Sequence, residues 1–246
     1  MIPWFHIICL IFFTRHIDTH IILTRVGTAT SVKMAVRLIS VSQPLIPGIK
    51  TAEEHIGYCA RVSNPTNQIQ DPARLLKYCI KNKHWSIFEM ANMVVEIKTT
   101  RAIAAQVLRH RTFTFQEFSQ RYAEVADAPV PVEARTQDTK NRQNSFETED
   151  EALKMWWLRE QQALYEDSLR LYNQAVEKGI AKESARFVLP LSTPTTMYMN
   201  GTVRSWIHYI DLRSGNGTQK EHKEIADACK EIFKAQFPVT ADALEW

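Results

Sequence analysis

The sequence predicts a single α+β domain in which a small antiparallel sheet is flanked by several helices. Stretches of alternating apolar and polar residues, typical of half-buried strands, occur at residues 36–41, 92–98 and 195–199. Segments with apolar residues at helical spacing accompany them, most clearly at residues 151–178 and 203–211. Across the 246 residues we find no internal repeat and no change in composition that would indicate a second domain.

The first 33 residues are predicted to be an extension that precedes this domain. Residues 1–13 are apolar, but the run is shorter than the ~18 residues that a membrane-spanning helix needs. It also lacks the basic flank of a signal peptide. Because the first strand-like stretch begins at Ala35, we expect the domain to cover residues 34–246, with Met34 as its natural start.

The first half of the domain is expected to contain one strand and two short helices. Thr51, followed by two glutamates, is a typical N-cap residue, and Asp71 with Pro72 is a typical helix start. Asn64-Pro65 separates the two helices. The predicted elements are a strand at 36–41, a helix from Thr51 to about 61, a helix from Asp71 to about 81 and a loop from His84 to Ser86.

The second half is expected to be richer in helices. Its predicted elements are a strand at 92–98, a helix from Thr99 or Thr100 to His110, an extended segment from Phe113, a long loop at 127–150, a helix at 151–178 ended by Gly179, a short helix at 181–189, a strand at 195–199, a turn at Asn200-Gly201, a helix from Val203 and a helix at 220–237.

Two of these helices have a clear apolar face. The long helix carries a stripe that we expect to pack in the core or against another subunit: Leu153, Trp157, Leu164, Leu171 and Ala175. In the helix from Val203 the apolar face holds Val203, Trp206, Ile207 and Ile210, and the opposite face holds Arg204, His208 and Asp211. A solvent-exposed, salt-bridged face would explain the second set without any function.

Composition limits the classes of function. A net charge of +3 suits a small anionic ligand and is weak for a nucleic-acid-binding protein. The four cysteines (Cys9, Cys59, Cys79 and Cys229) show neither zinc-site spacing nor a disulfide framework, so we expect no metal site and a reducing, cytoplasmic compartment. No glycine pattern of a Rossmann turn or P-loop is present, so a nucleotide cofactor would bind in another way.

The segment from Arg101 to Tyr122 carries the densest set of functional side chains. It contains four arginines together with a histidine, a glutamate and a serine. Gln106, Arg109 and His110 would share the polar face of a helix, and Glu117, Ser119 and Arg121 would share one side of an extended segment. Guanidinium groups suit phosphates and carbonyl-rich rings. The alternative is a basic helix end followed by an ordinary core strand.

The same segment resembles the signature of the flavin-dependent thymidylate synthases, Arg-His-Arg-x-x-Ser-x-Asn-Glu-x-Ser-x-Arg-Tyr. The match runs from Arg109 to Tyr122, with Thr114 in place of the first serine and Gln116 in place of the asparagine. The resemblance extends over residues 83–89, 185–191 and 211–213, and covers roughly Ala35 to the C-terminus.

That resemblance implies reductive methylation of dUMP to dTMP without a cysteine nucleophile. Methylenetetrahydrofolate would supply the carbon, and FAD, reduced by NADPH, would supply the hydride. Members of the family are homotetramers whose sites are shared between subunits. No membrane or nucleic-acid partner is implied.

The resemblance also implies a set of site residues. Those expected to bind dUMP are Gln106, Arg109, Glu117, Ser119, Gln120, Arg121, Arg186 and Arg213. Those expected to bind FAD are His84, Ser86, Arg109, His110, Arg111, Glu117, Arg204 and His208. Arg213 would be catalytic, because a guanidinium at the N3 edge of uracil favours the N3 anion. Arg186, set among apolar residues, needs an anion, which agrees with a nucleotide-binding role.

Two alternatives remain open from the sequence. The first is a non-enzymatic domain that binds single-stranded nucleic acid through the Arg-His-Arg segment and its interleaved phenylalanines. The second keeps the fold and FAD but acts on another pyrimidine nucleotide.

Overall fold

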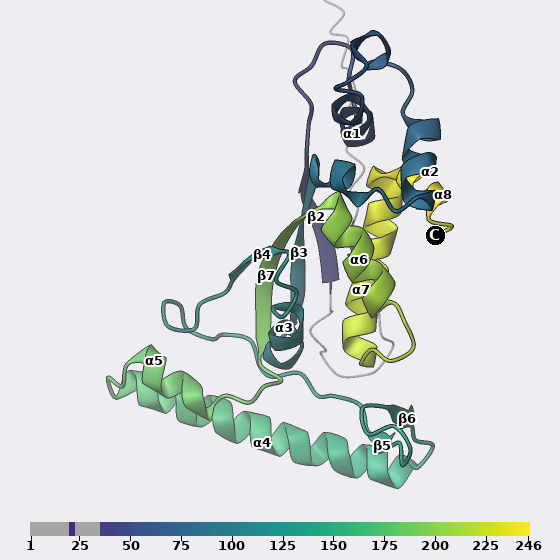
Figure 1. Cartoon of the computed structure of the whole chain (residues 1–246). Helices are drawn as coiled ribbons and strands as arrows, with labels where there is room; N and C mark the ends of the chain where they lie inside the picture. Colours follow the sequence, from purple (N-terminus) through teal and green to yellow (C-terminus); the bar gives the residue numbers. More distant parts are fainter. Residues whose placement is uncertain (1–19, 23–34) are drawn as a thin grey trace, which may run out of the picture.

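The computed structural model describes residues 20–22 and 35–246 and is built around a five-stranded antiparallel sheet (Figure 1). The strand order is β1-β2-β3-β7-β4. The strands are β1 (His20–Ile22), β2 (Ala35–Val41), β3 (Asn92–Thr100), β4 (Thr114–Glu117) and β7 (Pro194–Thr202). The three strands that the sequence predicts are therefore β2, β3 and β7 at the centre of the sheet, and the α+β fold class is confirmed.

The sheet has one apolar face and one polar face, because side chains alternate along each strand. Met93, Val95 and Ile97 of β3 are fully buried, as are Met197 and Met199 of β7. On the other face a polar cluster spans three strands: Arg37 donates to Glu96 at 2.9 Å, and the Tyr198 hydroxyl donates to the same carboxylate at 3.0 Å.

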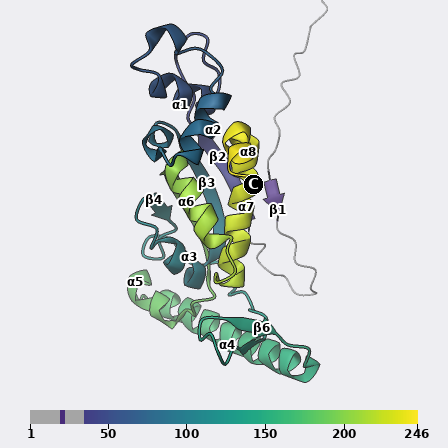
Figure 2. The same cartoon turned by 45° about the vertical axis from the view of Figure 1, so that its right-hand side comes forward.

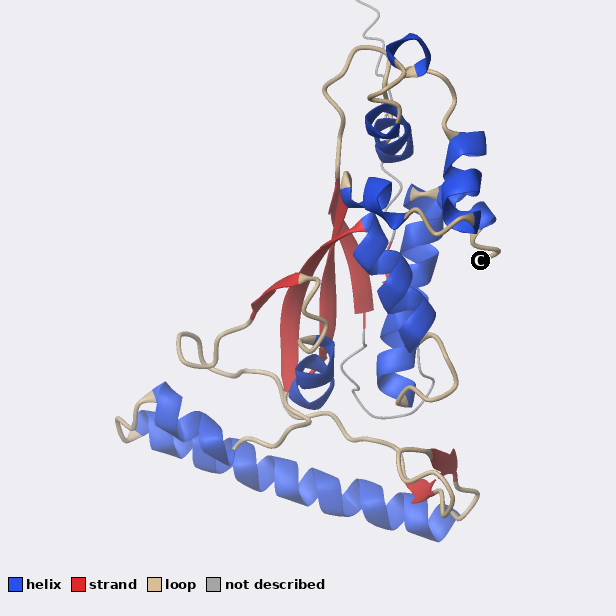
Figure 3. Ribbon diagram, in the orientation of Figure 1, coloured by secondary structure: helices blue, strands red, loops and turns tan. Residues whose placement is uncertain are grey.

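Two helices cover the apolar face, α6 (Val203–Arg213) and α7 (Lys220–Gln236), as Figure 3 shows. Trp206 is fully buried, and its indole Nε1 donates to the carbonyl of Met93 at 2.9 Å, which fixes α6 against β3. The remaining helices are α1 (Ala52–Ala60), α2 (Ala73–Lys81), α3 (Arg101–Val107), α4 (Glu151–Glu177), α5 (Lys182–Ala185) and α8 (Pro238–Ala243), with short 3₁₀ turns η1 (Pro65–Asn67), η2 (Trp85–Glu89) and η3 (Arg186–Val188).

Several element boundaries differ from the prediction. Helix α3 ends at Val107 rather than His110, and Thr100 occupies its N-cap position without a side-chain capping bond. The segment from Trp85 is the 3₁₀ turn η2 and not a loop. The predicted loop at 127–150 contains a hairpin, β5 (Arg135–Gln137) and β6 (Ser145–Glu147), and α8 follows α7. Asp71 accepts from the amide of Ala73 at 3.0 Å, but Pro72 is the N-cap.

The predicted turn at Asn200-Gly201 is wrong, because β7 runs through both residues to Thr202. Gly201 lies directly against the ring of Phe113, and a Cβ built on it would approach that ring to 2.4 Å. The glycine therefore provides room for an aromatic side chain in the core rather than freedom for a turn.

Helix α4 lies along one edge of the molecule and extends beyond the body formed by the sheet, α6 and α7 (Figures 1 and 2). It begins at Asp150, whose carboxylate accepts from Leu153 N at 3.0 Å, and is followed by Gly179 at φ 84°, as predicted. Its buried residues are Gln161, Tyr165, Ser168 and Tyr172. The predicted stripe lies beside this face, and Leu164 and Leu171 are 59% and 48% exposed.

The predicted N-terminal extension lies outside the described residues, apart from β1, which pairs with β2. Within the described part of the chain, no helix combines the length and the apolarity that crossing a membrane requires.

Candidate active site

Three helix ends meet at the best-defined polar site of the described chain: the end of α3, the end of α6 and the start of α7. Arg213 is the last residue of α6, and its Nε donates to Nε2 of His110 at 2.9 Å. The loop after α3 is held beside α6, because the Ser205 hydroxyl donates to the carbonyl of Thr112 at 3.3 Å. The resemblance places both members of the Arg213–His110 pair in the site, and the fold makes them neighbours.

His110 is a neutral imidazole in this setting. Burial lowers its pKa to about 4, and the positive charge of Arg213 adds to the effect. Its ring lies edge-on to Tyr209, with 4.8 Å between ring centroids. Since Nε2 accepts from Arg213, the ring hydrogen lies on Nδ1.

Gln106 is held from two directions by residues of α7. Its amide nitrogen donates to Oε1 of Gln219 at 2.6 Å, and its carbonyl oxygen lies 3.3 Å from Nδ1 of His222. His222 is fully buried, and burial, followed by the charge of Arg213, lowers its pKa to about 4. A neutral, buried histidine thus contacts Gln106, one of the predicted site residues.

Sequence analysis missed His222 and Gln219. The signal for His222 was present, because it lies on the apolar face of α7 with Ile225, Ala226 and Cys229. A histidine within such a stripe is buried and must find a hydrogen-bond partner. Gln219 gave no signal, since a polar residue before a helix is ordinary.

Glu117 lies at a different place, at the end of β4. Its Oε1 accepts from Arg101 Nη1 at 2.8 Å and from the Thr195 hydroxyl at 3.0 Å. The carboxylate is therefore already paired within the chain.

Ser119 and Arg121 do not share a side of an extended segment, and that prediction is wrong. The strand ends at Glu117, and the chain turns at Ser119, whose carbonyl accepts from Tyr122 N and Ala123 N. Gln120 is buried in this turn. Arg121 pairs with Glu183 of α5 at 3.1 Å, although both side chains are more than half exposed.

Arg186 follows α5 and lies close to this turn in the fold. It is half-buried, and its guanidinium lies 5.7 Å from the ring centroid of Phe187. Among the residues that the structure describes it has no acidic partner, so its need for an anion, inferred from the sequence, persists.

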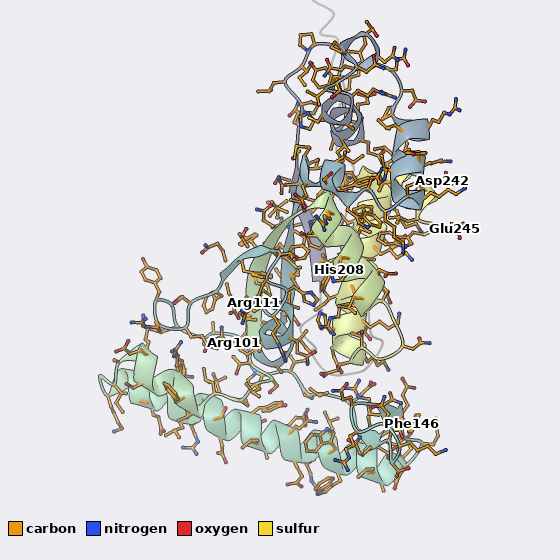
Figure 4. All side chains as sticks on the ribbon, viewed as in Figure 1. Arg101, Arg111, Phe146, His208, Asp242 and Glu245 are labelled. Carbon is orange, nitrogen blue, oxygen red and sulfur yellow. The ribbon has the colours of Figure 1, made fainter. Side chains whose placement is uncertain are left out.

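The outer side of α6 carries Arg204 and His208, both exposed. Arg204 forms an ion pair with Glu89 at the end of η2, the turn that also carries Ser86 and follows His84. Arg109 and Arg111 are exposed in the loop after α3, and neither pairs with an acid within residues 20–22 and 35–246. Figure 4 shows Arg111 and His208 near the middle of the molecule and Arg101 nearer to α4.

A single chain thus brings the predicted residues together in groups and not in one site. Arg213 and His110 lie at one end of α6, while Arg204 lies nine residues away near its other end, about 13 Å along the axis. Ser119, Arg121 and Arg186 lie in a further group beside α5.

The arrangement withdraws two of the three phenylalanines on which the nucleic-acid alternative rests, while the third, Phe118, is 38% exposed. Phe113 is only 6% exposed and packs edge-on against Trp206 at 4.8 Å, so its ring is not available to stack on bases. Phe115 is half-buried and packs against the same core.

Comparison with known proteins identifies close relatives. Residues 37–239 match the model of the family described as "Thymidylate synthase complementing protein". A "Probable flavin-dependent thymidylate synthase" of Paramecium bursaria Chlorella virus 1 is 63% identical over 215 residues, which are 87% of this chain and 100% of the relative. A "Flavin-dependent thymidylate synthase" of Synechocystis sp. is 53% identical over 216 residues, again 87% of this chain and 100% of the relative.

A solved structure also resembles the chain. It is a UMP/dUMP methylase, PolB, from Streptomyces cacaoi bound with 5-Br dUMP. The TM-score is 0.74 at 25% sequence identity, over 86% of this chain and 94% of that one.

Proposed function

The chain belongs to the thymidylate synthase complementing protein family, and from this premise we propose that it methylates dUMP reductively to dTMP as a flavin-dependent thymidylate synthase. The observation that carries the proposal is the 63% identity along the full length of a relative of that name. We further propose methylenetetrahydrofolate as the carbon donor and NADPH as the reductant.

The residues suit chemistry without a nucleophilic cysteine. Cys229 is fully buried, and burial raises the pKa of its thiol well above the ordinary value. Burial also raises the pKa of Cys79. A thiolate is therefore disfavoured at both positions. The three described cysteines are free. We propose a reducing, cytoplasmic compartment from the cysteine spacing of the sequence.

Arg213 would activate the pyrimidine electrostatically. Its Nε is engaged by His110, which holds the guanidinium in one orientation and leaves the terminal Nη groups as donors. Directed at the N3 and carbonyl edge of uracil, these groups would favour the N3 anion, which makes C5 nucleophilic. Neutral His110 accepts from the guanidinium without competing with it for the anion.

The exposed cations fit a flavin nucleotide. Arg109, Arg111 and Arg204 present guanidinium groups, and His208 an imidazole, on the surface around α6. Such donors suit a pyrophosphate and the negative charge of a reduced flavin ring. When bound, FAD would supply the hydride. His84 and Ser86 would extend the same site, with Glu117 beside it.

The nucleotide phosphate would bind in the group beside α5. Within the described residues, Arg121 is held by a solvent-exposed ion pair with Glu183, which stabilises weakly and can be exchanged for a phosphate. Arg186 and the exposed Ser119 would add a guanidinium and a hydroxyl. Gln106, Arg109 and Gln120 would complete the pocket for dUMP.

We also propose that the protein is a homotetramer with sites shared between subunits. Two observations support this proposal. The predicted residues form separate groups in one chain, and the apolar stripe of α4 is left exposed, with Leu164 and Leu171 on it.

An anaerobic assay tests the proposed function. The flavin-loaded protein is reduced, dUMP and methylenetetrahydrofolate are added, and flavin reoxidation and dTMP are measured together. Formation of both supports the proposal. Flavin binding without dTMP would show that the substrate is wrong. Since the resembling structure is described as a UMP/dUMP methylase, UMP is tested in parallel for the other-pyrimidine alternative. Failure to bind flavin on reconstitution would refute the flavin-dependent assignment.

A further inference from the structure

Gln106 lies within a hydrogen-bond chain that begins on the β5–β6 hairpin and ends at a buried histidine. Arg135 Nη2 donates to the Glu221 carboxylate at 3.0 Å, and Gln219 Nε2 donates to the same carboxylate at 2.9 Å. Gln219 Oε1 accepts from Gln106 at 2.6 Å, and Gln106 Oε1 faces His222 Nδ1 at 3.3 Å. The sequence separation between Gln106 and His222 is 116 residues, so the fold alone creates this chain.

The chemistry of Glu221 fixes the direction of every bond in it. A carboxylate only accepts hydrogen bonds, and the carboxylate of Glu221 forms an ion pair with Arg135 at 2.8 Å. Gln219 must therefore turn its amide nitrogen to Glu221 and its oxygen to Gln106. Gln106 must in turn present its nitrogen to Gln219 and its oxygen to His222. The opposite direction would place an oxygen of Gln219 against the carboxylate.

The tautomer of His222, the last residue of the hydrogen-bond chain, is then determined as well. His222 faces an acceptor, so Nδ1 must carry the hydrogen of the neutral ring. The ring is neutral because burial and the neighbouring charge of Arg213 lower its pKa to about 4. Its Nε2 is buried and has no hydrogen-bond partner among the described residues, so no protein acceptor competes for the tautomer.

The first turn of α7 makes the arrangement possible. The carbonyl of Gln219 accepts from the amides of His222 and Lys223, both at 2.9 Å, which begins the helix. Residues at i and i+3 lie on one face of a helix, so Gln219 and His222 reach the same amide of Gln106.

We propose that Gln219 and His222 are positioning residues of the pyrimidine site, which clamp the Gln106 amide in an orientation set by the Arg135–Glu221 pair. The inference rests on the proposed function only where it predicts kinetics. The hydrogen-bond direction and the tautomer of His222 belong to the protein itself and are measured without substrate.

The first experiment measures the tautomer in the full-length protein. Solid-state ¹⁵N spectra of protein labelled at histidine distinguish a protonated from an unprotonated ring nitrogen, and the His222→Asn spectrum identifies the His222 signals. We expect Nδ1–H in the wild type. In Glu221→Gln the side-chain oxygen still accepts from Arg135, while the new amide donates to Gln219. The direction of each hydrogen bond from residue 221 to His222 then reverses, and the hydrogen of His222 moves to Nε2.

A matched control uses the same substitution on the same helix. Glu231→Gln removes an exposed glutamate that pairs with Lys234, and it should leave the His222 signals unchanged. An Nε2–H tautomer in the wild type, or an unchanged tautomer in Glu221→Gln, would overturn the proposal.

The second experiment measures kinetics. His222→Asn keeps a donor near the position of Nδ1, whereas His222→Leu removes it. We expect a KM for dUMP close to that of the wild type in the asparagine variant and about three- to tenfold higher in the leucine variant, with a smaller change in kcat. Equal KM values in the two variants would refute a positioning role. If neither the wild type nor the variants form dTMP, the proposed function has failed, while the tautomer result still stands or falls by itself.

Discussion

The Arg213–His110 pair determines what each of its side chains can do. A guanidinium donates only, so the imidazole nitrogen that faces it must accept, and His110 cannot be protonated there without breaking the bond. The low pKa of His110 agrees with this constraint. The pair therefore places one fixed positive charge, and not two, beside the expected uracil edge.

Replacement of Arg213 is the most direct test of this arrangement. We expect Arg213→Ala to bind flavin like the parent protein but to lower kcat for dTMP formation by about 10²–10³-fold, as for loss of one preorganised donor. Flavin absorbance after gel filtration and single-turnover dTMP formation provide the two measurements. Arg74→Ala, at an exposed position on α2, is the control. Near-normal turnover in Arg213→Ala would exclude the activation role.

Buried neutral histidines also make stability depend on pH. The folded-state pKa of His222 is about 4, against 6.5 for the free side chain. The unfolded state thus binds more protons between these values, so the stability that His222 contributes is complete above pH 6.5 and is lost as the pH falls toward 4. His110 acts in the same direction.

As the pH falls toward 4, the free energy of unfolding should decrease through His222 by an amount on the order of 1–3 kcal/mol. Urea unfolding of the wild type and of His222→Asn, at about pH 7 and about pH 4.5, would measure it. The free energy of unfolding should fall less in the variant over this interval. Parallel pH profiles of the two proteins would contradict the assignment.

At the residue scale the sequence pointed to individual residues but not to the contacts between them. The signature segment led to His110, and the resemblance led to Arg213, but their contact joins residues 103 positions apart. A local sequence pattern does not predict a contact between residues so far apart in the sequence. Similarly, the ion pair between Arg135 on the β5–β6 hairpin and Glu221 on α7 joins residues 86 positions apart.

At the element scale, the sequence predicted helix starts whose capping residues are close in the sequence. The N-cap at Thr51 was predicted, and in the structure it forms a capping box with Glu54, with bonds of 3.1 and 3.0 Å. The start of α8 was missed, although Pro238 at its first position is a local helix-start signal. The acceptor for its first turn is distant in sequence: Glu53 of α1 accepts from Thr240 N and Oγ1, both at 2.7 Å.

The misassigned turn at Gly201 provides an element-scale prediction. Gly201→Ala places a methyl group into the ring of Phe113, so β7 or the loop after α3 must shift. We expect a loss of about 1–3 kcal/mol in the free energy of unfolding. Gly217→Ala is the matched control, because a Cβ there meets no atom within 4 Å. Equal denaturation midpoints for the two variants would show that Phe113 yields without cost.

At the scale of the whole molecule, three stretches of alternating residues were enough to predict the fold class. They did not predict which face of α4 is exposed. The stripe on α4 was expected to pack in the core or against another subunit. Within one chain Leu164 and Leu171 of this stripe stay exposed, and Tyr165 and Tyr172 lie on the buried face. These tyrosines are amphipathic: Tyr165 donates to Gln161 at 3.0 Å, and the Tyr172 hydroxyl accepts from Val125 N at 3.2 Å. A stripe count that weights aliphatic residues does not find such a face.

The exposed stripe gives the last prediction, at this scale. If α4 packs against a second copy, then Leu164→Glu combined with Leu171→Glu puts charges into that contact, where an unpaired charge is costly. The variant should sediment as a smaller species at the same concentration and lose flavin and turnover together, because the shared sites come apart. Its helical circular dichroism should persist, since both leucines are about half exposed in the single chain. Gln162→Glu, an exposed substitution on the same helix, controls for added charge. A double variant with the parent's mass and activity would show that α4 is not the assembly surface.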